Sequence, residues 1–477
     1  MNTAVCFVFK RKKFIIFTVL FGVVGILLCA ISFIPAVHKY LVEYGMAIVH
    51  HHPKAQALLL NRLLSITAAI GIFIFAALII FVIFKRAIQA FCFKHWQALL
   101  IAVVSVCAIA IRIPAFNFAS MDYTAYIESW ITYLKANGNL AGLAALDADY
   151  QSPYLFLISL ISYLPWAVIP AAIKLLSCAF DFLCAVLAWK IVCRVTHAST
   201  RIHGLYAYCT VLFLPTVIMN GGLWGQCDSI YTAFCLWMLL SFLDNKPKRA
   251  LALFGIAVAF KLQAIFLLPF IIFLLVYRLW NGRLLPISII SFFAAFVPGW
   301  IAGRPLYDWI ITLAKEISRP TDLTSNAPNL CAWIHNGKEL NFMISMMLVV
   351  FVIAMLGTLF FFMVGKNKRK QNLPAQTILL LFLFCSLALP FFLPHMHERY
   401  FYIAELAAVI YAFAVPSRWY LPFLIIFPSC STYSEFLFGK GIVPLHHLVF
   451  PMCIALILVS KWLFKDLQSV SPRAAAK

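Results

Sequence analysis

Charged residues are scarce in this chain. Of its 477 residues, 64% are hydrophobic and only 11% are Asp, Glu, Lys or Arg. A water-soluble globule carries about 25% charged residues, so the composition excludes one of this length. The alternating ten-residue segments that are typical of a transmembrane β-barrel are also missing. The sequence therefore predicts an all-α, polytopic integral membrane protein.

Motifs that bind nucleotides, metals or cofactors are missing as well. The chain has no GxxxxGK[ST] segment and no GxGxxG after a strand. Its 14 Cys include no CxxC pair and lie mostly in apolar runs, which is typical of small buried hydrophobic residues. We therefore expect no cofactor, no disulfide framework and no resident metal.

Apolar runs of spanning length predict about fourteen transmembrane helices, within a range of 12–14. Their centres are expected near residues 24, 74, 105, 183, 212, 236, 257, 272, 292, 352, 384, 408, 426 and 454. We divide the chain into an N-terminal pair of helices (1–96), a transmembrane core (97–434) and a C-terminal helix with a tail (435–477).

Basic residues account for the formal net charge of +21. Their position in short clusters between apolar runs indicates membrane topology, so we expect membrane lipids and no nucleic acid as partners. The cytoplasmic clusters are expected at 10–13, 85–94, 194–201, 246–249, 278–283, 366–370, 418 and 461–465. The loops on the other face are then 35–63, 114–171, 219–228, 261–269, 299–338, 391–400 and 432–444.

The first long loop of the core holds an acid directly after a span, in MDYTAYIESWITYL. Tyr126, Trp130, Tyr133 and Leu134 follow helical spacing, so we expect an amphipathic helix lying in the headgroup region with its aromatics down. Asp122 stands at the start of this helix. It is either an N-cap that binds free backbone N–H groups or a carboxylate that takes a proton from an acceptor hydroxyl.

Two more regions place polar groups in apolar surroundings. Lys174 and Asp181 lie seven residues apart on one helical face and are expected to offset each other's charge. NGGLWGQCDSIYT places Trp224 beside Gln226 and Asp228. The Trp is either a membrane-interface residue or part of a sugar-binding wall, with the indole for stacking and the amide for hydroxyls.

Three later segments complete the polar set. Lys261 precedes Gln263 in KLQ and either snorkels to the surface or faces an anion in a cavity. The loop with Asn326 and Asn329 is either a connector or part of a site. HMHERYF crowds His395, His397 and Arg399 at the end of a span; its HxH pair is a weak metal signal, whereas Arg with His suits a phosphate.

Together these motifs resemble the GT-C superfamily of polytopic glycosyltransferases, over roughly residues 97–434. Within it, they resemble bacterial mannosyltransferase-like proteins related to the GPI-anchor mannosyltransferases. GGLWGQCDSIYT is similar to the W-G-Q-x-D-S-x-Y signature, DYQSPY to the D-Y-P-P element, and MDYTAYIESW, KLQAIFLLP and HERYF to further elements. Gln151 and Ser152 depart from the D-Y-P-P pattern.

The resemblance implies an inverting hexosyl transfer, mannose by preference, from a polyprenyl-phosphate sugar to a glycan, lipid or protein on the outer face of a bacterial inner membrane. Asp122 would be the general base. Donor phosphate would bind Lys261, His395, His397 and Arg399. Sugar and acceptor would contact Tyr123, Asp149, Tyr150, Trp224, Gln226, Asp228, Gln263, Asn326 and Asn329. Some GT-C members use a divalent cation, but we expect none here.

Two other functions fit a polytopic chain with external polar clusters. A lipid-linked sugar flippase or transporter would show repeated halves and polar groups near mid-membrane, and neither is evident in the sequence. A surface-polysaccharide polymerase or ligase would show a dominant external loop late in the chain.

Overall fold

The computed structural model describes residues 95–196, 201–318, 322–334, 338–366 and 373–469. Contacts between Cα atoms divide the chain into two units, 1–96 and 97–477, and the described residues belong almost entirely to the second. The helices expected near residues 24 and 74 lie outside the described residues, as do the basic clusters at 10–13 and 85–94.

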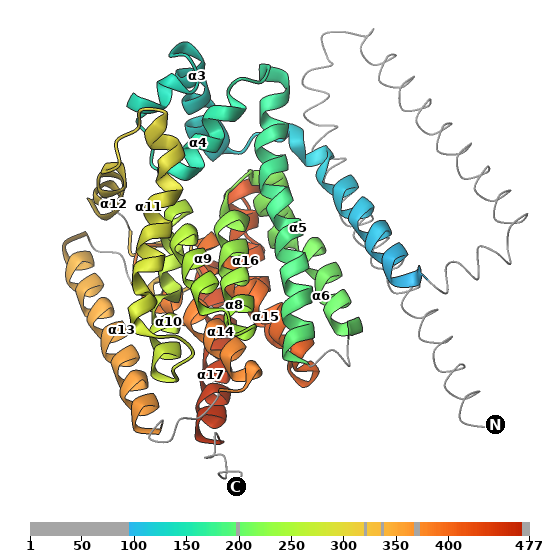
Figure 1. The fold of residues 1–477 in the computed structure, drawn as a ribbon, viewed down its shortest axis with the longest axis vertical. Helices are drawn as coiled ribbons and strands as arrows, with labels where there is room; N and C mark the ends of the chain where they lie inside the picture. The colour runs from blue at the N-terminus through green and yellow to red at the C-terminus, as the bar shows by residue number, and fades with distance from the viewer. Residues whose placement is uncertain (1–94, 197–200, 319–321, 335–337, 367–372, 470–477) are drawn as a thin grey trace, which may run out of the picture. The chain divides into compact units, whose positions relative to one another are not determined.

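Helices make up nearly all the regular structure in these ranges, as predicted. Seven helices are long and apolar enough to cross a membrane: His95–Asn117, Trp166–Val195, Gly282–Ile301, Leu340–Gly365, Ala375–Phe392, Leu421–Phe438 and Leu445–Gln468. Six of them correspond to α5 (Ile169–Val195), α11 (Leu285–Ile301), α13 (Lys338–Lys366), α14 (Ala375–Phe392), α16 (Leu421–Phe438) and α17 (Leu445–Ser469) (Figure 1).

An eighth span is formed if one bent pair of helices crosses the membrane once. Ile202–Phe213 and Pro215–Trp224 pass the same test together, with a bend of 48° between them. The pair comprises α6 (Arg201–Phe213), α7 (Pro215–Val217) and the π-helix η5 (Ile218–Trp224). Pro215 lacks the N–H that would continue the ladder of α6, which accounts for the break.

The predicted number of fourteen spans is not confirmed. Helices occur at the expected centres 236, 257, 272 and 408, but they are too short for the spanning criterion: α8 (Asp228–Leu243), α9 (Pro247–Phe260), α10 (Leu268–Val276) and α15 (Tyr402–Ala414). A helix of 14 residues, such as α9, rises about 21 Å against a hydrocarbon thickness of about 30 Å. Each of the four begins or ends at a polar motif, which interrupts the apolar run.

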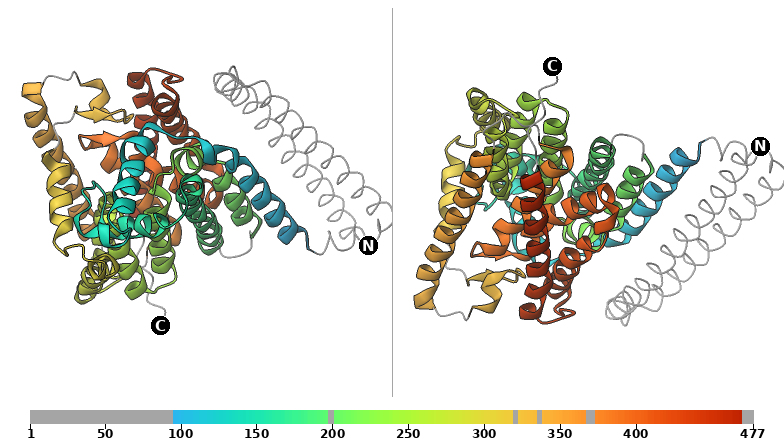
Figure 2. Two further views of the ribbon diagram at one scale, coloured as in Figure 1. Left: turned by 90° about the horizontal axis from the view of Figure 1, so that it is seen from above. Right: turned by 90° about the horizontal axis from the view of Figure 1, so that it is seen from below.

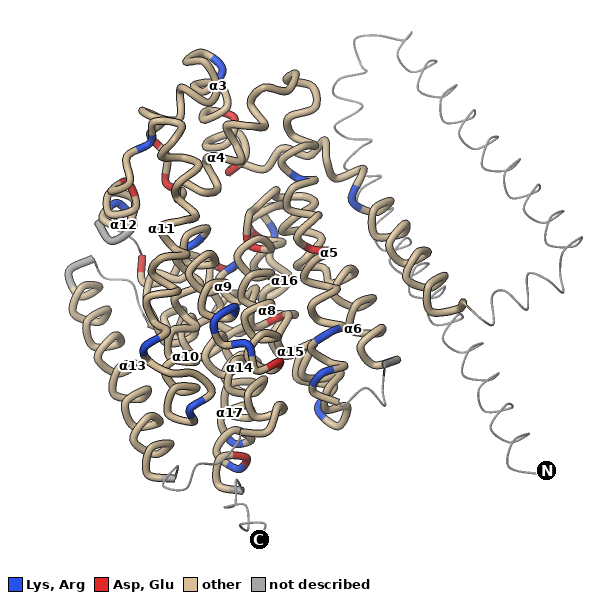
Figure 3. Tube along the Cα trace, in the orientation of Figure 1, with Lys and Arg blue, Asp and Glu red and all other residues tan. Residues whose placement is uncertain are grey.

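The core helices alternate in direction, so their connections gather at two ends (Figure 1). We call the end that holds 114–168, 225–227, 261–267 and 393–401 the site end. The opposite end, which we call the basic end, holds 244–246, 277–284 and 415–420. Figure 3 shows Lys and Arg positions at this lower end, and others at the upper end, among them on α3 and α12.

The remaining elements are short. They are η1 (Pro114–Asn117), η2 (Tyr123–Ile127), α3 (Glu128–Ala136), η3 (Ala141–Ala145), α4 (Ser152–Ile161), η4 (Trp166–Val168), η6 (Leu262–Leu267), η7 (Gly282–Leu284), α12 (Asp308–Ser318), η8 (Leu330–Trp333), η9 (Glu398–Phe401) and η10 (Pro416–Arg418). α13 stands at one edge of the helical bundle in both views of Figure 2.

A two-stranded parallel sheet joins two distant loops at the site end. β1 (Thr324–Ser325) pairs with β2 (Met396–His397), with Thr324 opposite Met396 and Ser325 opposite His397. This pairing holds the loop after α12 against the segment between α14 and α15.

The first long loop forms the expected helix, but the helix packs on protein. Trp130 and Leu134 are buried, with exposures of 5% and 0%, in a cluster with the second half of the loop and α4. Tyr126 and Tyr133 are 44% and 36% exposed. The expectation that all four side chains face the headgroups is therefore wrong for Trp130 and Leu134, because α4 supplies an apolar surface beneath them.

Candidate active site

A cavity of about 1060 Å³ opens among the loops of the site end. Residues from segments far apart in the sequence line it. Nine of the predicted site residues are among them: Asp122, Asp149, Tyr150, Gln226, Lys261, Gln263, His395, His397 and Arg399. Tyr123, Trp224, Asp228, Asn326 and Asn329 do not line it.

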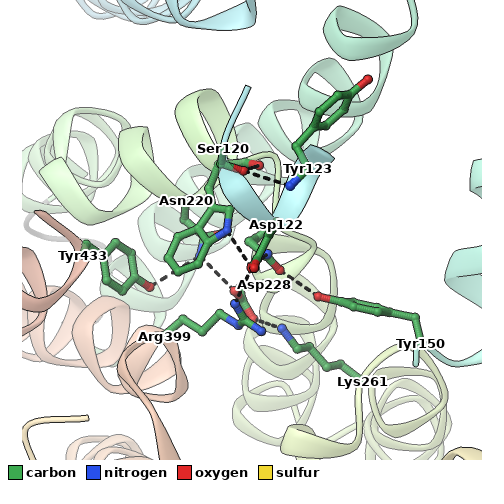
Figure 4. A network of polar contacts seen from close by, with 11 residues as sticks. Ser120, Asp122, Tyr123, Tyr150, Asn220, Asp228, Lys261, Arg399 and Tyr433 are labelled. Atoms are coloured by element: carbon green, nitrogen blue, oxygen red, sulfur yellow. Dashed lines mark hydrogen bonds and ion pairs between the residues drawn. The ribbon is translucent and has the colours of Figure 1, made fainter. Parts of the chain in front are cut away.

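Asp122 is fixed by three N–H donors that all bind one oxygen. Its Oδ2 accepts hydrogen bonds from Trp224 Nε1 at 2.9 Å, Gln226 Nε2 at 3.1 Å and Arg399 Nη1 at 3.3 Å (Figure 4). The side chain does not cap the helix that follows. Ser120 Oγ instead accepts from the backbone N–H of Tyr123 at 3.2 Å. Of the two roles predicted for Asp122, the structure therefore favours the carboxylate of a site over the N-cap.

A second ion pair lies behind the first. Lys261 Nζ pairs with Asp228 Oδ1, and Asn220 Nδ2 donates to Asp228 Oδ2 at 2.8 Å. Asp228 is fully buried, whereas Lys261 is 6% exposed and borders the cavity. Asp228 therefore supports Lys261 from behind, and the expectation that it contacts sugar directly is not met. Lys261 does not snorkel to the surface.

Trp224 also stands behind the cavity. Its side chain is fully buried, stacks on Phe436 with ring centroids 4.3 Å apart, and has the guanidinium carbon of Arg399 5.2 Å from its ring centre. The predicted role of the indole in sugar stacking does not fit this burial. The indole N–H instead positions Asp122.

The two glycines before Trp224 are explained by a buried ion pair. A Cβ on Gly221 would lie 2.7 Å from Asp181 Oδ2, and one on Gly222 would lie 3.4 Å from the side chain of Arg112. Arg112 and Asp181 pair at 3.2 Å with side-chain exposures of 1% and 0%. The π-helical turn η5 thus packs directly on this pair; π-helical turns are frequent at functional sites.

Lys174 and Asp181 do not offset each other as predicted. Lys174 Nζ donates to the carbonyl oxygens of Ala115 and Phe118, while Asp181 takes Arg112 as its partner. The prediction paired two residues of α5 because they share a face. The end of the preceding span, His95–Asn117, and the residue directly after it supplied the partners for both.

The D-Y-Q-S-P-Y element forms one wall of the cavity. Tyr150 OH donates to Gln226 Oε1 at 2.7 Å and so links this wall to Asp122 through a shared amide. Burial raises the pKa of Tyr150 well above its ordinary value. Gln151 has φ −70° and ψ 148°, which a proline would also adopt, so its departure from the family pattern leaves the local backbone unchanged.

The same loop holds a pair of acidic residues whose spacing played no part in the sequence-based predictions. Asp147 and Asp149 have D-x-D spacing, but their side chains diverge. Asp147 is 86% exposed and pairs with Lys315, whose hydrogen bond lowers the pKa of Asp147, whereas Asp149 lines the cavity. The two carboxylates therefore do not act as one site.

Both histidines of this segment line the cavity, His395 directly before β2 and His397 as its last residue. His395 has a left-handed backbone (φ 60°), and its ring nitrogens lie 3.0 Å from Ser345 Oγ and 3.0 Å from the carbonyl oxygen of Asp322. His397 packs edge-on against Tyr400, with ring centroids 5.3 Å apart. Both rings line the cavity beside Arg399.

Glu398 is the buried acid of this segment. It is 1% exposed, and its Oε1 has no hydrogen-bond partner among the described residues. Burial raises the pKa of Glu398 to about 7, against the opposing effect of Arg399. Among the described residues, its side chain makes no hydrogen bond to Arg399 or to a histidine.

Two predicted site residues hold the loop after α12 in place. Asn326 Nδ2 donates to the carbonyl oxygen of Thr432 at 3.1 Å. Asn329 Nδ2 donates to those of Pro390 and Leu393 at 3.2 and 3.1 Å. These amides are engaged by backbone and lie off the cavity, which favours the connector role over sugar binding.

Several residues that build the site had no predicted role. Four of them lie around Asp122, Asp228 and Trp224: Ser120, Asn220, Tyr433 and Phe436. A further residue, Arg112, could have been predicted from the sequence, because a charged residue at the end of an apolar span is expected to have a buried partner. Among the described residues, no three His, Cys, Asp or Glu side chains come together as metal ligands.

The comparisons with known proteins bear on this geometry. The model of Glycosyltransferase family 87 matches residues 149–390, just over half of the chain. The chain belongs to glycosyltransferase family 87. With its apolar spanning helices, it is a membrane glycosyltransferase. No curated protein matches the chain, and the relation to GPI-anchor mannosyltransferases is not confirmed.

The family match includes some of the site residues and leaves others outside its range. Asp149, Gln226 and Lys261 lie within residues 149–390, whereas Asp122 and Arg399 lie beyond them. The fold brings these two residues together at 3.3 Å, although they are 277 positions apart. Their place in a glycosyltransferase site therefore rests on geometry.

Proposed function

We propose that this protein transfers a hexosyl group, by preference mannosyl, from a polyprenyl-phosphate sugar to an acceptor hydroxyl, with inversion and with Asp122 as general base. One observation carries the proposal. The carboxylate borders a large cavity, is held through a single oxygen by three N–H groups, and lies beside an arginine suited to phosphate.

The arrangement leaves one oxygen of Asp122 for chemistry. Oδ2 takes all three hydrogen bonds that the described residues make to this carboxylate. Oδ1 is then the atom that receives the proton of the acceptor hydroxyl. Base assistance of this kind accelerates a reaction about 10²–10⁴-fold.

The reaction is a single displacement. The acceptor oxygen forms a bond to the anomeric carbon as the bond from that carbon to the phosphate oxygen breaks. The hydroxyl proton passes to Asp122, and the electron pair of the broken bond leaves with the polyprenyl phosphate. Attack on the side opposite the leaving group inverts the anomeric centre.

Cations at the cavity wall would stabilise the leaving phosphate. Arg399 offers a planar fork that suits phosphate oxygens, and His395, His397 and Lys261 line the same cavity. Fixed charges of this kind act more strongly in a cavity poor in water than in bulk solvent. Asp149, Gln226 and Gln263 supply polar groups for sugar hydroxyls.

The cavity also suits a substrate with a lipid tail. Phe342, Met346 and Val349 line it from α13, which is one of the spanning helices. A long apolar chain can therefore lie against these side chains while its phosphate meets Arg399. A soluble nucleotide sugar would gain nothing from such a wall.

The positive-inside rule supports an extracytoplasmic site. The basic end carries Lys246, Arg278, Arg283 and Arg418 in its loops and Lys248 at the start of α9. Such clusters mark the cytoplasmic side of bacterial inner-membrane proteins. The cavity lies at the other end, so its substrates would arrive from the outer face.

Loss of the carboxylate tests the proposal. In full-length protein in lipid vesicles supplied with a panel of radiolabelled polyprenyl-phosphate sugars, Asp122→Asn is expected to lower transfer about 10²–10⁴-fold, with free polyprenyl phosphate released in step with transfer by the wild type. The matched control is Asp147→Asn, an exposed neighbour off the cavity, which should retain wild-type activity. Full activity of folded Asp122→Asn would remove Asp122 as the base.

A further inference from the structure

Two ion pairs border the cavity, and they differ in how firmly they are held. Asp228 is 0% exposed and is bound by both Lys261 and Asn220. In the other pair, Arg399 and Asp122 have side-chain exposures of 13% and 22%. Both members of this second pair line the cavity, so an entering anion can reach and disrupt it.

Arg399 holds Asp122 weakly for an arginine. The pair is made by a single nitrogen, Nη1, at 3.3 Å, whereas a bidentate arginine–carboxylate pair uses two nitrogens at about 2.7–2.9 Å. Arg399 Nε is buried without a hydrogen-bond partner in the described chain. The guanidinium therefore has donors to spare for a second oxygen-rich group.

Asp122 does not depend on Arg399 for its position. Trp224 Nε1 and Gln226 Nε2 bind the same oxygen at 2.9 and 3.1 Å, both closer than Arg399. These neutral donors are themselves held, Trp224 by stacking on Phe436 and Gln226 by Tyr150 OH. If Arg399 moved away, the carboxylate would keep its orientation and lose only its counter-charge.

We propose that Arg399 changes partner during the reaction, leaving Asp122 for the phosphate of the lipid-linked donor, so that donor binding itself releases the base. This inference rests on the proposed function. A carboxylate whose counter-charge has moved to the phosphate is left to bind the acceptor hydroxyl. Arrival of the phosphate would therefore release Asp122 at the moment when a sugar is present to react.

The exchange makes Asp122 and the phosphate competitors for one guanidinium. Replacing the carboxylate by an amide should free Arg399 and tighten phosphate binding, even though the same change is expected to lower transfer about 10²–10⁴-fold. Simple repulsion between two anions would also be relieved by that replacement. The two causes differ in one respect, since relief of repulsion does not require Arg399.

A double-mutant cycle separates these causes. Polyprenyl phosphate binding is measured for full-length wild type, Asp122→Asn, Arg399→Gln and the double variant, each in nanodiscs of one lipid composition. Asp122→Asn is expected to bind about tenfold more tightly than wild type, which corresponds to about 1.4 kcal/mol. In the Arg399→Gln background the same replacement should change affinity less than twofold. Asp147→Asn, off the cavity, should bind as the wild type does.

Each other outcome counts against the exchange. A tenfold gain that persists without Arg399 would show plain repulsion. An unchanged or weaker affinity in Asp122→Asn would show that the carboxylate does not compete for Arg399, and if that variant were also inactive the base would stand while the exchange fell. Absence of polyprenyl phosphate binding in all four proteins would overturn both the exchange and the proposed donor.

Discussion

The charged side chains of this site are stabilised by partners of opposite charge from distant parts of the chain. An unpaired charge in an apolar interior is costly, and removal of one partner of a buried pair typically costs about 3–5 kcal/mol. Three pairs meet this requirement: Asp122 with Arg399, Asp228 with Lys261, and Asp181 with Arg112. Glu398 differs from these carboxylates, because its Oε1 makes no hydrogen bond among the described residues.

Because of Glu398, the free energy of unfolding should fall as pH rises. Its folded pKa of about 7 lies above the ordinary value of 4.5 because burial disfavours the ionised form. The folded protein therefore binds a proton that the unfolded chain has lost between these two values. The resulting stability is complete below pH 4.5 and is lost as pH rises to about 7, by an amount on the order of 3 kcal/mol.

Apparent melting temperatures in detergent, measured from pH 4.5 to 8, check this prediction. Glu398→Gln cannot ionise and should show a smaller decline over that range than the wild type. Glu128→Gln, at an exposed position of α3, is the control and should follow the wild-type curve. If Glu398→Gln also followed that curve, Glu398 would not be the group that takes up the proton.

At the scale of elements, the site depends on segments that depart from a regular α-helix. Asp122 directly precedes the π-helix η2, and Trp224 ends the π-helix η5. Gly225 follows with a left-handed φ of 76°, which a residue with a side chain rarely adopts. These departures turn the indole and the amide of Gln226 toward Asp122, where a continuous helix would have carried them past it.

Gly221→Ala should therefore disturb both fold and activity. The added methyl would lie 2.7 Å from Asp181 Oδ2, so either η5 or the Arg112–Asp181 pair must shift. We expect a loss of stability of about 1–3 kcal/mol together with lower transfer activity, because Trp224 moves with η5. Thermal denaturation and the transfer assay on the same preparation measure both effects.

Gly357→Ala is the matched control for this replacement. Gly357 lies in the helix α13 and has no atom within 4 Å of an added Cβ. Replacement of a helical glycine by alanine at an open position stabilises by about 0.5–1 kcal/mol. If Gly221→Ala matched Gly357→Ala in stability and activity, close packing of η5 on Asp181 would not matter.

At the scale of the whole molecule, the alternation of helices separates the chemistry from the basic loops. Most cavity residues come from connections at the site end, and the Lys and Arg residues of 244–249, 277–284 and 415–420 lie at the basic end (Figures 1 and 3). The short helices α8, α9, α10 and α15 keep this alternation although they miss the spanning criterion. The assignment of each loop to one end of the bundle therefore does not depend on whether these four helices are counted as spans.

Thiol labelling of intact cells tests this sidedness. Asn137→Cys, at an exposed position after α3, should react with a membrane-impermeant reagent added from outside. Lys248→Cys, at an exposed position of the basic end, should react only after permeabilisation. The wild type, with its native Cys, sets the background. Reversal of the two results would place the cavity on the cytoplasmic side and contradict the extracytoplasmic site.

The sequence alone determined that this is a helical membrane protein, and it identified nine of the residues that line the cavity. Composition and apolar runs report burial in lipid directly, and motif residues are recognisable by type and order. It could not determine which charges pair, because Asp122 and Arg399 are 277 positions apart and only packing decides their distance. The prediction for Trp224 was wrong because a tryptophan can line a cavity or pack behind it, and its residue type does not tell the two apart. The predicted helix lengths were wrong because the sequence does not show at which residue of a polar motif a helix begins or ends.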